Sequence, residues 1–210
     1  KLLLVLALCA VHGMLVKPPF FDPAKKYPMI YLIHGGPQGA FEDGFHYRWN
    51  PALFAAPGYV AVFVNFRGST GYGRQFWESS FGQWGLTMQD DITDGVQWLI
   101  DEGIADPERI AIYGASYGGY ATLAGVTLTP DLYAAAVDYV GVSNLFTFLG
   151  TIPPYWKPML EKMQAMVGDP VKDKARLEAT SPALLAERIP EWRQRAAIPV
   201  ASVLRLLGQG

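Results

Sequence analysis

The sequence has little cysteine, little histidine and little charge. Of its 210 residues one is cysteine, Cys9, so no internal disulfide can form, and only three are histidine. Charged residues make up 17% of the chain and the formal net charge is −2. The chain therefore lacks the excess of positive charge that is typical of nucleic-acid-binding proteins. The sequence also has no H-E-x-x-H motif and no cysteine and histidine cluster at metal-ligand spacing, so we expect neither a metal nor another cofactor.

Long apolar runs are also scarce, apart from the first ten residues. After residue 10 every apolar run is short or interrupted, so we expect no membrane-spanning helix. Residues 1–10 read KLLLVLALCA, one lysine before nine apolar residues, which resembles the core of a signal peptide. A buried strand or the disrupted end of a fragment would give the same pattern. We treat residues 1–10 as a leader or a fragment end, and the compartment stays open between secreted or periplasmic and cytoplasmic.

Residues 11–210 contain short apolar strands that alternate with helices. Half of the chain is hydrophobic, enough for one domain with a sizeable core. Continuous apolar strands and intervening helices indicate an α/β fold with a mostly parallel sheet and helices on both faces. The expected strands are Val11–Val16, Met29–Ile33, Tyr59–Val64, Arg109–Tyr113 and Ala134–Val140, and the expected helices are Met88–Ile100 and Tyr117–Val126. The proline-rich Thr151–Lys157 is expected to form a loop or lid outside the core.

The sequence GASYG at residues 114–118 matches the G-x-S-x-G pattern of a serine nucleophile. It lies between an expected strand and an expected helix, which is the context that this motif requires. The serine would sit on a sharp, strained turn, where Gly114 and Gly118 avoid side-chain clashes. The following helix N-terminus makes the backbone N–H of Tyr117 a natural oxyanion donor. A chance match in a glycine-rich chain is the alternative, but the context favours Ser116 as the nucleophile.

A second motif, HGGP at residues 34–37, directly follows the expected strand MIYLI. Hydrolases with the G-x-S-x-G turn place an oxyanion loop after an early strand, often with this pattern. Glycine lets the backbone N–H approach the substrate closely, so Gly36 is the expected second oxyanion donor. A plain turn is the alternative. We expect His34 to make structural hydrogen bonds rather than to act as the catalytic base.

The glycine-rich segment GSTGYG at residues 68–73 could suggest a phosphate-binding loop. It lacks the lysine and the G-K-[ST] ending that such a loop uses. We therefore expect a structural turn, with the preceding Arg67 in an ion pair or hydrogen-bond network.

The motifs HGGPQG, NFRGSTGYG and GASYGGY together resemble the prolyl oligopeptidase family of serine peptidases. The likeness is to its acylaminoacyl peptidase and dipeptidyl peptidase branch, and it runs from about Val11 to Ser181-Pro182. The resemblance implies an α/β-hydrolase fold and hydrolysis of peptide bonds in short peptides through an acyl-enzyme at Ser116. It also implies that Gly36 and Tyr117 donate backbone hydrogen bonds to the oxyanion.

The same resemblance implies two further features. Family members usually carry a β-propeller before this domain, which restricts access to short peptides, and no propeller is present in this sequence. The region Val142–Phe148 corresponds to the part that helps to line the pocket for the residue before the scissile bond. Leu145 and Phe148 are the candidate lining residues, with ordinary core packing as the alternative for each.

The rest of the expected catalytic triad is missing. The fold orders its triad as Ser, then Asp or Glu, then His, but His12, His34 and His46 all precede Ser116. Ile198–Leu204 could form a further strand, but no acidic residue follows it. The earlier carboxylates Asp131, Asp138, Asp169 and Asp173 are poor candidates. We expect that the domain is truncated before the Asp and the His of its triad. Three explanations stay open: the sequence is a fragment, its reading frame is disrupted near Arg188, or the two residues have truly been lost.

Three functions remain open from the sequence. The leading one is a serine peptidase domain that acts on peptides and is inactive as this isolated chain, because a serine hydroxyl without its base is a weak nucleophile. A carboxylesterase would use the same turn and oxyanion hole. A non-catalytic remnant that binds peptides is the third, and the missing histidine favours it for the chain in isolation.

Overall fold

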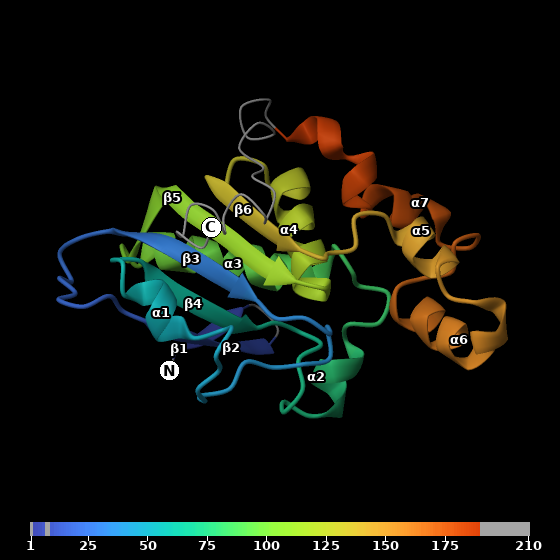
Figure 1. Cartoon of the computed structure of the whole chain (residues 1–210), viewed down its shortest axis with the longest axis horizontal. Helices are drawn as coiled ribbons and strands as arrows, with labels where there is room; N and C mark the ends of the chain where they lie inside the picture. The colour runs from blue at the N-terminus through green and yellow to red at the C-terminus, as the bar shows by residue number, and fades with distance from the viewer. Residues whose placement is uncertain (1, 7–8, 190–210) are drawn as a thin grey trace, which may run out of the picture.

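The computed structural model describes residues 2–6 and 9–189, which form a twisted sheet with helices on both faces (Figure 1). Within these residues the sheet has six strands in the order β1-β2-β4-β3-β5-β6. The strands are β1 (Leu2–Leu6), β2 (Cys9–Val16), β3 (Tyr27–Ile33), β4 (Val60–Asn65), β5 (Ala105–Ala115) and β6 (Ala135–Tyr139). β4, β3, β5 and β6 pair in parallel, whereas β1, β2 and β4 pair antiparallel. The mostly parallel α/β sheet is confirmed.

Each of the five expected strands is present, with ends that differ by a few residues. The first ten residues contribute β1 and the start of β2, which pair with each other from Leu2↔Gly13 to Leu6↔Cys9. The expected strand at Ile198–Leu204 lies outside the described residues.

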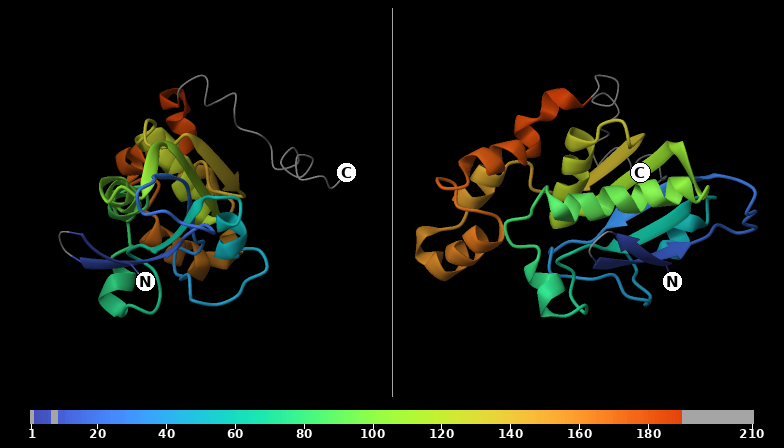
Figure 2. Two further views of the ribbon diagram at one scale, coloured as in Figure 1. Left: turned by 90° about the vertical axis from the view of Figure 1, so that its left-hand side faces the viewer. Right: turned by 180° about the vertical axis from the view of Figure 1, so that it is seen from behind.

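The two faces of the sheet are covered by different helices. Helix α1 (Pro51–Ala55) packs on one face against Leu32, Ala61 and Phe63. Helices α3 (Thr87–Asp101) and α4 (Tyr117–Leu128) pack on the other, and Figure 2 shows α3 across that face when the molecule is seen from behind. Because successive side chains of a strand point to opposite faces, a continuous apolar strand serves both layers, as the sequence predicted.

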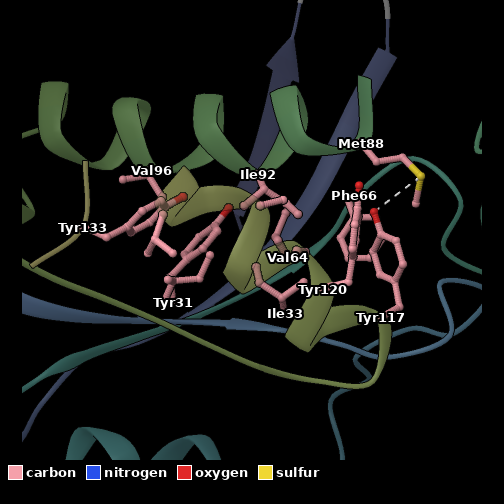
Figure 3. Packing of buried hydrophobic residues seen from close by; sticks show 14 of the residues in the cluster. Tyr31, Ile33, Val64, Phe66, Met88, Ile92, Val96, Tyr117, Tyr120 and Tyr133 are labelled. Atoms are coloured by element: carbon pink, nitrogen blue, oxygen red, sulfur yellow. Dashed lines mark hydrogen bonds between the residues drawn. The ribbon is translucent and has the colours of Figure 1, made fainter. Parts of the chain in front are cut away.

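The larger core lies between the sheet and α3 and α4. Figure 3 shows Ile92 and Val96 of α3 directed toward Tyr31 of β3, while Met88 meets Tyr117 at the start of α4. The Tyr117 hydroxyl donates to the Met88 sulfur at 3.6 Å. The helical spacing expected over Met88–Ile100 is thus confirmed, and its apolar side faces the sheet.

The remaining helices lie mainly beyond the carboxyl ends of β3 and β5 (Figure 1). They are α2 (Arg74–Glu78), α5 (Leu145–Gly150), η1 (Pro154–Trp156), α6 (Lys157–Met166), α7 (Lys174–Ala179), η2 (Pro182–Leu184) and η3 (Ala186–Arg188). Thr151–Lys157 lies outside the core, as predicted, with Tyr155 and Trp156 exposed. Its first three residues form a turn, and from Pro154 on it is helical. Pro154 and Pro158 stand in the first turns of η1 and α6, where a missing N–H costs no helical hydrogen bond.

An ion pair ties the turn after β4 to helix α3. The Arg67 guanidinium donates to both carboxylate oxygens of Asp91, at 2.6 to 3.0 Å, and to the Thr87 carbonyl at 3.0 Å. The Asp91 side chain is fully buried, and its second oxygen also accepts from the Arg67 backbone N–H. The interaction predicted for Arg67 is therefore confirmed. Removing one partner of such a pair leaves an uncompensated buried charge.

His34 ties the loop after β3 to the same turn. Its ring is 7% exposed and stacks on Phe66 at 4.4 Å between ring centroids. The Nδ1–H donates to the Gly35 carbonyl at 2.8 Å, and Nε2 lies 2.8 Å from the Ser69 hydroxyl oxygen, which also lies 2.7 Å from the Phe66 carbonyl. Burial lowers the pKa of His34 to about 4, with the bond to Gly35 acting in the opposite direction. The neutral ring makes structural hydrogen bonds, as the sequence predicted.

Helix α4 crosses β3 at a glycine. A Cβ atom at Gly118 would collide with the carbonyl oxygen of Ile33, so the backbones meet only because this position has no side chain. We expect Gly118→Ala to lower the free energy of unfolding by about 3 kcal/mol, because overpacking forces the backbones apart. Urea denaturation at pH 7 measures the change.

Gly150→Ala is the matched control for Gly118→Ala. It also places alanine in a helix, but a Cβ there meets no atom within 4 Å. It should leave stability unchanged or raise it by up to about 1 kcal/mol, since alanine is the better helix former. Equal stabilities of the two variants would contradict the close approach of α4 to β3.

The buried neutral His34 makes stability depend on pH. The unfolded chain takes up a proton near pH 6.5 and the folded chain only near pH 4, so acid favours unfolding within this window. We expect the free energy of unfolding to fall by up to about 3 kcal/mol from pH 7 to pH 4 through this residue. In His34→Gln the fall should be smaller by that amount, whereas His46→Gln, at an exposed position, should follow the unchanged chain. Identical pH profiles for all three proteins would overturn this interpretation.

Candidate active site

Ser116 occupies the turn between β5 and α4. Its backbone has φ 57° and ψ −117°, which costs a non-glycine residue on the order of 1–3 kcal/mol. The turn is held by two hydrogen bonds, from the Ser116 N–H to the Tyr139 carbonyl at 3.1 Å and from the Tyr120 N–H to the Ser116 carbonyl at 3.0 Å. Ser116 itself is exposed. The strained turn thus presents the hydroxyl at the carboxyl end of the sheet, as the motif predicts.

The glycines around Ser116 are required by close packing. A Cβ at Gly114 would collide with the Gly118 carbonyl across the turn. A Cβ at Gly119 would collide with Asp138 and lie 2.6 Å from the Cα of Gly141. The turn can therefore be this sharp only with glycine on both sides of the serine.

Tyr117 is the first residue of α4 and is fixed by its buried side chain. The ring packs edge to face on Trp84 at 4.7 Å, and burial raises the pKa of the Tyr117 hydroxyl well above its usual value. The N–H groups of a helix's first turn have no partner within the helix, and they carry partial positive charge. The Tyr117 N–H therefore lies next to the serine with its donor capacity available, which supports its predicted role in the oxyanion hole.

The HGGP loop passes directly beside the nucleophile. A Cβ at Gly35 would lie 3.0 Å from the Ala115 carbonyl oxygen and 3.4 Å from the Ser116 Cβ. The next residue, Gly36, has φ 129°, a conformation that favours glycine. The structure brings the loop and Ser116 together, and Gly36 as the second oxyanion donor stays a prediction.

The histidines of the chain do not activate Ser116 in this structure. Both ring nitrogens of His34 are used in structural hydrogen bonds. His12 is exposed on β2 and meets the Tyr72 ring at 5.1 Å. The Nδ1 atom of His46 accepts from the Arg48 and Trp49 backbone N–H groups at 3.1 Å each. Within residues 2–6 and 9–189, no histidine or carboxylate is hydrogen-bonded to the Ser116 side chain.

The two candidate pocket-lining residues differ in exposure. Leu145 is fully buried in the main core, and its N–H donates to the Ser181 hydroxyl at 3.1 Å. Phe148 is half-buried and stacks on Trp84 at 6.1 Å. The burial of Leu145 fits the alternative of core packing, whereas Phe148 is partly exposed and remains a candidate.

A cleft that was not predicted from the sequence adjoins Ser116. It has a volume of about 640 Å³ and is lined by β2, the HGGP loop and the segment 40–51. Its aromatic residues are Phe41, Phe45, Trp49 and Phe63. The cluster of aromatic residues after HGGPQG was the available signal, but its relation to Ser116 depends on the fold.

The residues that the structure describes contain no group of three or more His, Cys, Asp or Glu side chains placed to hold a metal ion. None of their helices combines the length and apolar character needed to cross a bilayer.

Comparison with known proteins identifies the relatives of this chain. Residues 45–191 match the model of the prolyl oligopeptidase family. Dipeptidyl aminopeptidase BIII of Pseudoxanthomonas mexicana is 44% identical over 164 residues, covering 77% of this chain and 24% of that protein. Dipeptidyl peptidase family member 6 of Caenorhabditis elegans is 41% identical over 172 residues, covering 80% of this chain and 23% of that protein. The chain thus spans about a quarter of the length of these relatives.

Solved structures agree with this assignment. A puromycin-hydrolyzing peptidase of Mycobacterium tuberculosis has TM-score 0.77 and 32% identity, covering 86% of this chain and 27% of that one. An acylaminoacyl peptidase of Pyrococcus horikoshii has TM-score 0.77 and 30% identity, covering 90% of this chain and 30% of that one. These neighbours confirm the α/β-hydrolase fold, and the family model covers most of the chain. The chain belongs to the prolyl oligopeptidase family.

Proposed function

We propose that this chain is the nucleophile-bearing part of a serine peptidase, in which Ser116 attacks the carbonyl carbon of a peptide bond. The serine oxygen bonds to that carbon, and the carbonyl oxygen becomes an oxyanion. The Tyr117 and Gly36 N–H groups stabilise this oxyanion. Collapse breaks the C–N bond, the amine leaves with a proton, and water then hydrolyses the ester at Ser116.

The observation that carries this proposal is the strained exposed turn at Ser116. Ser116 adopts a φ of 57°, although this backbone conformation is unfavourable for any residue other than glycine. Ser116 directly precedes the first residue of α4, and the glycine loop passes beside it, an arrangement that supports stabilisation of developing negative charge there. The names of the two curated relatives, both dipeptidyl peptidases, support peptides as the substrate class. A propeller preceding this domain in longer relatives stays a prediction.

The proposed oxyanion donors, Gly36 and Tyr117, are among the described residues, but no histidine or carboxylate among these residues is hydrogen-bonded to the Ser116 side chain. Without a base to take the proton of the serine hydroxyl, only the residual rate enhancement from the oxyanion hole and from substrate binding remains. We therefore propose that these 210 residues alone hydrolyse peptides very slowly, and that full activity needs an Asp and a His supplied from elsewhere. This favours peptide binding without turnover as the behaviour of the isolated chain. No structural observation favours the carboxylesterase alternative.

Labelling with a fluorophosphonate probe tests the role of Ser116. We expect slow labelling at Ser116, since the turn and the oxyanion donors are preformed, and no labelling of Ser116→Ala. Mass spectrometry of the digested protein locates the label, and circular dichroism confirms that both proteins are folded. Labelling at another serine, or no labelling of the folded chain, would contradict the assignment.

Assays with a peptide p-nitroanilide and a short p-nitrophenyl ester test the proposed lack of a base. We expect kcat to be lower than that of a complete triad by about 10⁴-fold or more. Hydrolysis of either substrate at an ordinary enzymatic rate, about 1 s⁻¹ or faster, would show that a base acts on Ser116 after all. A preference for the ester at such a rate would favour the carboxylesterase.

A further inference from the structure

The turn after β6 is bonded to the turn that carries Ser116. Strands β5 and β6 run in parallel with Ala115 opposite Tyr139, so the two strands end side by side. One hydrogen bond joins the two turns, from the Ser116 N–H to the Tyr139 carbonyl at 3.1 Å. Since φ is the rotation about the bond between this nitrogen and the Cα atom, the position of the Tyr139 carbonyl restrains the strained conformation of the serine.

The residue after Tyr139 is strained as well. Val140 has φ 51°, which is an outlier for a β-branched residue. Its side chain is 74% exposed, so burial of that side chain does not account for the conformation. Three non-glycine residues in the described part of the chain have a positive φ, and two of them, Ser116 and Val140, adjoin the same hydrogen bond. The backbone at Val140 must therefore be held by its surroundings.

Asp138 supplies a contact that holds Val140 in place. Its Oδ1 atom accepts from the Gly141 N–H at 2.8 Å, which closes a side-chain turn around the two residues between them. The carboxyl group is half-buried; burial raises the pKa of Asp138, with the bond from Gly141 acting in the opposite direction. A Cβ atom at Gly119 or at Gly141 would collide with Oδ1. The carboxyl group is thus packed between the turn after β6 and the first turn of α4.

We propose that Asp138 is a positioning residue for the nucleophile. The inference rests on the proposed function of Ser116. Asp138 acts through the backbone: its bond to Gly141 keeps Val140 in the strained conformation, and the turn then presents the Tyr139 carbonyl to the Ser116 N–H. Without the carboxyl group, Val140 relaxes toward a negative φ. The Tyr139 carbonyl then turns away, and the serine loses the contact that restrains its φ.

A second aspartate turn in the same chain provides matched controls. The Oδ1 atom of Asp169 accepts from the Val171 and Lys172 N–H groups at 2.8 and 3.0 Å. Val171 follows two residues after this aspartate, as Val140 follows Asp138, and it is 85% exposed. It is not among the residues with a positive φ, and its turn lies between α6 and α7. The two turns therefore share their aspartate and valine but differ in strain and in the bond to Ser116.

Fluorophosphonate labelling and amide hydrogen exchange of the whole chain test the proposal. We expect Asp138→Ala to slow labelling of Ser116 about tenfold and to speed exchange of the Ser116 amide about tenfold, because the strained turn is released. Asp138→Asn should restore both rates, since its side-chain oxygen can accept the same hydrogen bond. Asp169→Ala also loses backbone hydrogen bonds, but it should leave both rates unchanged. Mass spectrometry measures labelling, and ¹⁵N spectra measure exchange.

Replacing the strained valine tests the mechanism directly. Val140→Gly should restore both rates in the Asp138→Ala background, because glycine adopts a positive φ without the help of the carboxyl group. Val140→Gly alone should keep the labelling rate and raise the urea midpoint, since the strain is removed. Val171→Gly, which relieves no such strain, should not raise the midpoint. Circular dichroism shows that each variant is folded.

Several outcomes would overturn the role of Asp138: unchanged rates in Asp138→Ala, a variant Asp138→Asn as slow as Asp138→Ala, or a lowered urea midpoint in Val140→Gly. If Asp138→Ala alone does not fold, the double variant decides, and slow labelling of its folded form contradicts the proposal.

Amide exchange separates this inference from the proposed function. A chain that is labelled at Ser116, with equal labelling and exchange rates in all variants, overturns the role of Asp138 alone. A chain that is not labelled contradicts the proposed nucleophile. In that chain, faster exchange of the Ser116 amide in Asp138→Ala, reversed by Val140→Gly, still supports Asp138 as the residue that fixes the turn.

Discussion

The contact between helix α4 and the sheet is the constraint on which the site depends. Gly118 lets the helix backbone meet the Ile33 carbonyl, and Gly119 lets it meet Gly141, two residues after the end of β6. With any side chain at these positions the helix would stand further from the sheet, and the turn at Ser116 would open. The same approach fixes the N-terminus of α4, and therefore the Tyr117 N–H, beside the serine. The backbone strain at Ser116 is balanced by packing that is distributed over a large core.

The loops that complete the site are fixed by polar contacts rather than by the sheet alone. His34 holds the HGGP loop to Ser69, and Arg67 holds the neighbouring turn to Asp91 of α3. The two interactions occur in consecutive loops at the carboxyl ends of adjacent parallel strands, where α/β proteins commonly bind ligands. Neutral His34 is therefore a positioning residue for the loop, and its ring is unavailable as a base. No histidine or carboxylate among the described residues is hydrogen-bonded to the Ser116 side chain, so the proposed nucleophile has no proton acceptor among them.

In the proposed function the parts of the site contribute differently. The turn at Ser116, the N-terminus of α4 and the glycine loop are proposed to orient and polarise a peptide carbonyl. Proton transfer needs groups that are not hydrogen-bonded to Ser116 in the described residues.

The sequence by itself determined the features that depend on neighbouring residues. Continuous apolar strands, the helical spacing of Ile92 and Val96, and glycines flanking Ser116 all follow from local periodicity and backbone sterics. Tertiary structure decided what depends on residues far apart in the chain. Leu145 is part of the core because of how α5 packs, which its local sequence does not reveal. The cleft exists only because the segment 40–51 packs over strands β2 and β4 beside Ser116. Packing between segments that lie far apart in the chain leaves no periodic pattern in the sequence.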